Sequence, residues 1–107
     1  MESKYRISYL PLFYDDLDEI VAYIADELKN PAAANRLLDR VESAILERNN
    51  HAELFEPYYS ARNREYAYYR IYVGNFVVYY VIISDDDKKI MEVRRILYMG
   101  RNRDHML

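Results

Sequence analysis

The chain has 107 residues, a length typical of one domain, and we interpret residues 1–107 as a single domain. Hydrophobic residues make up 51% and charged residues 31%, which is a globular composition, and no apolar run is long enough to span a membrane. The absence of cysteine excludes disulfides, thiolate metal sites and cysteine nucleophiles. We therefore expect a small cytoplasmic domain with no membrane contact, no metal and no cofactor.

The net charge of −3 is unevenly spread along the chain. Residues 1–56 carry 12 acidic and 6 basic side chains, whereas residues 57–107 carry 6 acidic and 9 basic ones. Nine of the 13 tyrosines also lie after residue 57. A basic, tyrosine-rich second half can form one face that contacts a polyanion or an acidic partner.

The first half of the chain predicts one strand and then two helices. Apolar residues alternate over residues 4–10, which indicates a strand, and recur at helical spacing over residues 12–29. Asn30 and Pro31 are typical of the N-cap and first position of a second helix, which runs to about Arg48. Such a short joint predicts an antiparallel helical hairpin.

The second half predicts three consecutive strands after an irregular stretch over residues 49–64. Gly74 and Asn75 tolerate positive φ and are typical of a tight hairpin turn. The middle strand is apolar on both faces, which favours a central, covered position. The three predicted strands cover residues 66–73, 76–84 and 89–98.

The predicted order is β-α-α-β-β-β, an α+β fold. We expect the helical hairpin on one face of a mainly antiparallel four-stranded sheet, with the other face partly open and carrying tyrosines and arginines. On the last strand, simple alternation groups Met91 and Val93 with Leu97 on one face. It also directs Arg94 and Arg95 to opposite faces, so that only one of them can join a given site.

Five stretches in this order carry a pattern that covers nearly the whole chain. None is specific alone, but the ordered set resembles the RelE/ParE superfamily of toxins from bacterial type II toxin–antitoxin systems. The stretches are residues 5–8, 16–24, 30–34, 69–71 with 76–81, and 93–98 with 100–104.

This resemblance implies a toxin that inhibits growth and is neutralised by a cognate antitoxin, which would bind across the helical hairpin and the sheet edge. One branch of the superfamily cleaves mRNA on the ribosome, and another poisons DNA gyrase. Three functions stay open: mRNA cleavage or another block on translation or replication, gyrase inhibition by binding without chemistry, and a degenerate member without toxicity.

A metal-independent endoribonuclease needs cations for the phosphate charge and a group for proton transfer. In that case, we expect the arginines to bind phosphate and the histidine to act as general acid or base. The candidate catalytic residues all lie in the basic half: Arg70, Arg95, Arg101, Arg103 and His105. Aromatic residues beside arginines suit single-stranded RNA, and the candidate RNA contacts are Arg62, Arg64 and Tyr68.

Structural roles compete with these catalytic and RNA-binding roles. Arg70 is as suited to a cross-strand ion pair with Glu92 or Glu65 as to phosphate binding, and one of Arg94 and Arg95 is expected in an ion pair. The mRNA-cleaving branch commonly carries an arginine just after the hairpin turn, where this chain has Phe76. That departure weakens the ribonuclease interpretation.

Overall fold

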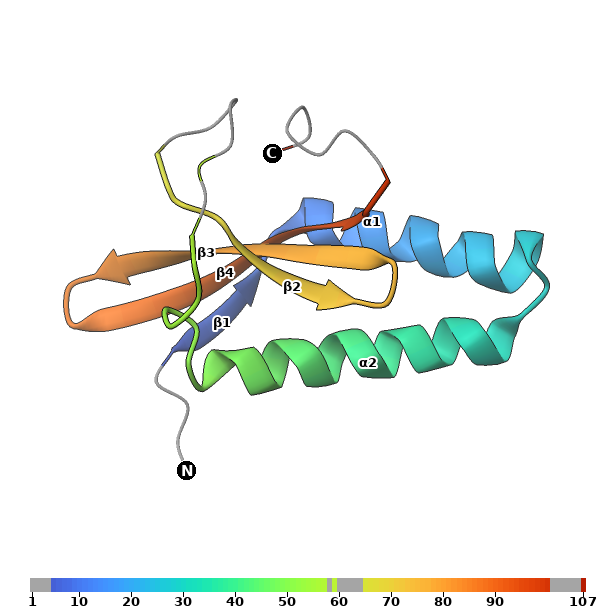
Figure 1. Cartoon of the computed structure of the whole chain (residues 1–107), viewed down its shortest axis with the longest axis horizontal. Coiled ribbons are helices and arrows are strands. Elements are labelled where there is room, and N and C mark those ends of the chain that lie inside the picture. Colours follow the sequence, from blue (N-terminus) through green and yellow to red (C-terminus); the bar gives the residue numbers. More distant parts are fainter. Residues whose placement is uncertain (1–4, 58, 60–64, 101–106) are drawn as a thin grey trace.

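The computed structural model describes residues 5–57, 59, 65–100 and 107, and its elements follow the predicted order (Figure 1). A short π-helix, η1, directly continues the first helix. The elements are β1 (Arg6–Tyr9), α1 (Pro11–Ala22), η1 (Tyr23–Glu27), α2 (Pro31–Asn49), β2 (Tyr69–Val73), β3 (Phe76–Asp85) and β4 (Lys88–Tyr98). The predicted α+β fold is confirmed.

The four strands form one sheet in the order β1-β4-β3-β2. β1 runs parallel to β4, whereas β3 is antiparallel to both β2 and β4. The predicted central position of the middle strand is confirmed, because β3 has a neighbour on each side and residues 77–81 are buried. No helix among these residues has the length and apolar character needed to cross a membrane.

The helical hairpin supplies one side of the main core. Asn30 caps α2, and its Oδ1 accepts a hydrogen bond from the backbone N of Ala33 at 3.1 Å. Phe13 of α1 and Val41 and Ile45 of α2 are buried in one cluster with Tyr80 of β3. Figure 1 shows the two helices as a hairpin lying along the sheet.

The opposite face of the sheet is more covered than expected. Its centre forms a second buried cluster, made by Tyr68, Val77, Tyr79, Val81, Leu97 and Leu107. Tyr79 is fully buried there and meets the ring of Tyr68 edge-on, with the centroids 6.3 Å apart. The arginines on this face therefore lie around an apolar centre.

A β-bulge in β4 changes which residues share a face. The register passes from Tyr79 opposite Arg95 to Tyr80 opposite Val93, which leaves Arg94 as the extra residue. Ile96 consequently joins Met91 and Val93 in the core under the helices, and Leu97 lies on the other face. The prediction that Leu97 shares a face with Met91 and Val93 was wrong for this reason.

Candidate functional site

The face of the sheet opposite the helices brings together three arginines, Arg70, Arg94 and Arg95, which we call the arginine cluster. Arg70 and Arg95 lie opposite Tyr79 on its two neighbouring strands, so Arg70, Tyr79 and Arg95 form a row across the sheet. The bulge turns Arg94 toward the same face, where it contacts Tyr68. The prediction that Arg94 and Arg95 point to opposite faces was therefore wrong.

Arg95 is held by a two-pronged ion pair to Asp16 of α1. Its Nε and Nη2 donate to Asp16 Oδ2 and Oδ1, each at 2.7 Å. Asp16 Oδ2 also accepts the backbone N–H of Ile96 at 3.1 Å, and the side chains of Arg95 and Asp16 are only 15% and 10% exposed. The hydrogen bonds to Asp16 raise the pKa of Arg95 and outweigh the effect of burial. This guanidinium is neutralised within the chain.

Arg94 also has an internal counter-charge. Its Nε donates to Glu92 Oε1 at 2.9 Å, and its Nη1 donates to the Tyr68 hydroxyl at 3.4 Å. The guanidinium carbon lies 5.3 Å from the ring centroid of Tyr66 and 5.9 Å from that of Tyr68. Burial lowers the pKa of Arg94, but the hydrogen bonds to Tyr68 and Glu92 raise it above its ordinary value overall. Only one of Arg94 and Arg95 was expected to form a structural ion pair, but each of them forms one.

The other predicted site residues lie in different places. Arg70 is half-buried on β2, and Tyr68 is buried with 3% of its surface exposed. A base could stack on Tyr68 only if the groups around it moved, and its role in RNA binding stays a prediction. Five predicted residues lie outside the described part of the chain, and their roles also stay predictions: Arg62, Arg64, Arg101, Arg103 and His105.

Asp16 is the residue of this site that sequence reasoning missed. Its place near the start of the predicted helix is explained by the helix dipole alone, which favours acidic residues there. A signal was available, because Asp16 lies four residues before Ile20 and next to Leu17, at the border of the apolar stripe of α1. A carboxylate at that border is well placed to meet a cation from the sheet.

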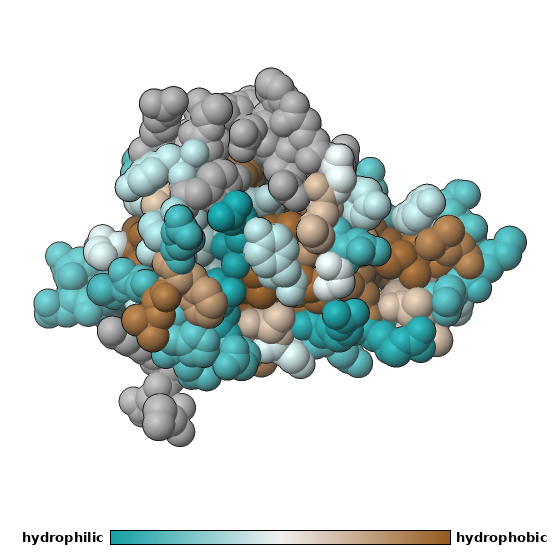
Figure 2. All heavy atoms as spheres, in the orientation of Figure 1, coloured by the Kyte–Doolittle hydropathy of each residue, from teal (hydrophilic) through white to brown (hydrophobic). Residues whose placement is uncertain are grey.

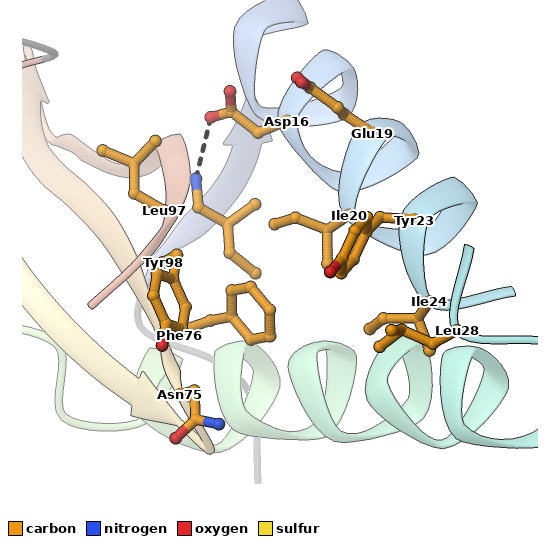
Figure 3. A pocket seen from close by; sticks show the side chains of 11 residues that line it. Asp16, Glu19, Ile20, Tyr23, Ile24, Leu28, Asn75, Phe76, Leu97 and Tyr98 are labelled. Atoms are coloured by element: carbon orange, nitrogen blue, oxygen red, sulfur yellow. Dashed lines mark hydrogen bonds between the residues drawn. The ribbon is translucent and has the colours of Figure 1, made fainter. Parts of the chain in front are cut away.

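A groove of about 680 Å³ lies beside the ion pair, between α1 with η1 and the end of the sheet. Figure 3 shows Ile20, Tyr23 and Leu28 on the helical side, across from Phe76 and Tyr98 on the strands. The hydrogen bond from Ile96 to Asp16, drawn as a dashed line, lies at one end. We call this feature the helix–sheet groove.

Within the described ranges, histidine and acidic side chains form no group of three or more that could hold a metal ion.

The order of elements and the mixed four-stranded sheet define a RelE/ParE-like protein. Residues 7–103 match the family of the ParE toxin of the type II toxin–antitoxin system, parDE. No curated protein sequence matches the chain. Because the family match spans most of its length, the chain belongs to the ParE toxin family of type II toxin–antitoxin systems, which implies an antitoxin partner.

Proposed function

We propose that this toxin inhibits growth by binding DNA gyrase and performs no RNA cleavage of its own. The family supports this proposal in general terms, because the matching description is that of a ParE toxin. The observation that carries it is the ion pair between Arg95 and Asp16, at 2.7 Å for both prongs.

A ribonuclease site needs arginines that are available to a phosphate group. A phosphate at Arg95 would first have to displace Asp16, whose two carboxylate oxygens each accept a hydrogen bond from the guanidinium at 2.7 Å in a part-buried setting. Arg94 is similarly occupied by Glu92, at 2.9 Å. Two of the three cluster arginines therefore act first as internal partners of carboxylates.

Phe76 supports the same conclusion. It follows the β2–β3 turn directly and packs with the core under the helices. Its ring meets that of Tyr98 edge-on, with centroids 6.0 Å apart. The position at which the resemblance to the mRNA-cleaving branch calls for an arginine is thus occupied by an apolar packing residue.

RNA cleavage is the second candidate, and one observation favours it. Arg70 and Arg95 flank Tyr79 in a single row across the sheet, an arrangement that could follow an RNA backbone. The two candidates differ in what they require of Arg70, which catalysis needs and gyrase binding through other surfaces does not.

The test is induction of the chain alone in a bacterial host, followed by measurement of growth, DNA breaks and RNA 5′ ends. We expect growth arrest with DNA breaks that disappear in a host whose gyrase resists the toxin, and no new RNA ends. Arg70→Ala should retain this toxicity at equal expression. New 5′ ends within translated codons, lost in Arg70→Ala, would contradict the proposal and support the ribonuclease.

A further inference from the structure

The outer edge of β2 is a strand edge that no described strand occupies. β2 lies at the end of the sheet, and its only neighbour among the described strands is β3. Its residues, Tyr69–Val73, are mostly aromatic or β-branched and include no proline or lysine, and its register with β3 is regular. Proteins commonly protect an edge strand with lysine, proline or a bulge. This edge has none of these features and can pair with another strand.

A groove of about 320 Å³ follows the same edge, between β2 and α2. We call it the edge groove. It is lined by Asp39, Arg40, Ser43 and Ala44 of the helix and by Tyr72 and Val73 of the strand. α2 packs against β2 and runs in the opposite direction (Figure 1). Figure 2 shows both hydrophilic and apolar side chains at the surface along α2. A strand added to β2 would therefore bring its own chain against this side of α2.

The charges on this side of α2 fit a second copy of the same helix in antiparallel orientation. Arg40, Ser43 and Glu47 are three and four residues apart, so they lie on one stripe of the helix, and all three are exposed. Arg40 forms no ion pair with a described residue. The side chain of Glu47 is 71% exposed and lies 3.7 Å from His51. A two-fold axis beside Ser43 brings Arg40 of each copy to Glu47 of the other.

The strand fits the same two-fold axis. Antiparallel pairing of β2 with its copy about Ile71 sets Arg70 of each copy opposite Tyr72 of the other. Both residues lie on the face away from the helices, because they are opposite Tyr79 and Val77 of the second buried cluster. Tyr72 is 58% exposed, and an aromatic ring beside a guanidinium is a favourable pair. The strand is therefore complementary to itself, as the helix is.

We propose that two copies of this chain associate through the edge of β2. The two four-stranded sheets then form one continuous sheet, and the two α2 helices lie antiparallel beside each other with two ion pairs between Arg40 and Glu47. The edge groove shares no lining residue with the helix–sheet groove. Self-association therefore leaves the helix–sheet groove to other partners. The inference does not depend on gyrase or RNA as the target.

A single introduced cysteine tests the position of the axis, because the chain has no cysteine of its own. Ser43→Cys should form a disulfide-linked dimer under mild oxidation, since the two copies of this exposed position lie next to each other at the axis. Ser84→Cys is the matched control. Ser84 is also exposed, but it lies beyond the part of β3 that pairs with β2. Equal cross-linking of the two variants would overturn the inference.

Sedimentation of the purified chain over a range of concentrations measures the strength of association. Arg40→Glu and Glu47→Arg should each weaken dimerisation about tenfold through like-charge contact, and more strongly at low salt. The double variant should restore dimerisation, because the exchanged charges attract again. Glu42→Arg makes the same change in charge on the side of α2 that faces Tyr9, and it should leave dimerisation unchanged.

Tyr72→Lys tests the strand itself, since a lysine on the edge lies opposite Arg70 of the other copy and should also weaken dimerisation. A chain that sediments as a monomer at every concentration, with circular dichroism showing that it is folded, would overturn the inference. So would the finding that Tyr72→Lys abolishes antitoxin binding and leaves self-association intact. Absence of gyrase-dependent DNA breaks would overturn the proposed function alone, because sedimentation is measured without gyrase.

Discussion

Asp16 and Arg95 lie 79 positions apart in the sequence, and their ion pair joins α1 to β4 in a mostly buried setting. Asp16→Asn keeps the shape of the side chain but leaves the guanidinium without its counter-charge. We expect a loss of about 3 kcal/mol in the free energy of unfolding, measured with urea. The exposed neighbour serves as control, because Asp15→Asn should change stability by less than about 0.5 kcal/mol. Equal unfolding of the two variants would contradict this account.

Tyr5 makes the stability of the fold depend on pH in the alkaline range. Its hydroxyl donates to Glu53 Oε1 at 2.7 Å, and burial, followed by this carboxylate, raises its pKa from 10.0 to about 12. The folded chain therefore keeps a proton that the unfolded chain releases near pH 10. The retained proton adds to the free energy of unfolding below about pH 10, and this contribution is lost as the pH rises toward about 12.

Urea unfolding at about pH 9 and about pH 11 checks this prediction. Tyr5→Phe should lose less stability than the unmodified chain between these two values, because it has no phenol to ionise. An identical loss in both proteins would show that Tyr5 is not responsible.

At the scale of elements, the joint between the helices depends on Asn30. Its Oδ1 accepts the amide N–H of Ala33, which has no partner within the helix. Asn30→Ala should therefore lower the free energy of unfolding by about 1 kcal/mol. Asn35→Ala, at an exposed position inside α2, is the control and should cause no loss, because alanine favours helices. If both variants unfold like the unmodified chain, the cap has no measurable effect.

The elements were predictable because their signals are local. Helical spacing, the Asn30–Pro31 joint and the Gly74–Asn75 turn each act over a few residues, and all three features are present in the structure. The bulge at Arg94 was not predictable, because alternation along β4 alone contains no sign of an extra residue. It is visible only against Tyr79 and Tyr80 of the neighbouring strand. The faces of Ile96 and Leu97 were consequently exchanged. The partner of Arg95 was missed for a different reason, because Asp16 lies 79 positions away and no local signal joins the two residues.

At the scale of the whole molecule, the two oppositely charged halves of the chain form ion pairs with each other. Asp16 pairs with Arg95, and Glu53 pairs with Lys89 at 2.6 Å. Part of the positive charge that suggested a polyanion-binding face is thus neutralised internally, while the carboxylates of α1 outside the ion pair stay exposed. This distribution favours recognition of a protein target over RNA binding.

The central claim is that this toxin acts on gyrase by binding. The most direct measurement is incubation of the purified chain with gyrase, ATP and plasmid DNA, followed by detection of cleaved DNA after removal of protein. We predict that broken DNA accumulates only when gyrase is present and decreases when the antitoxin is added. Unchanged DNA in this assay, together with mRNA cut on ribosomes by the same preparation, would contradict the claim.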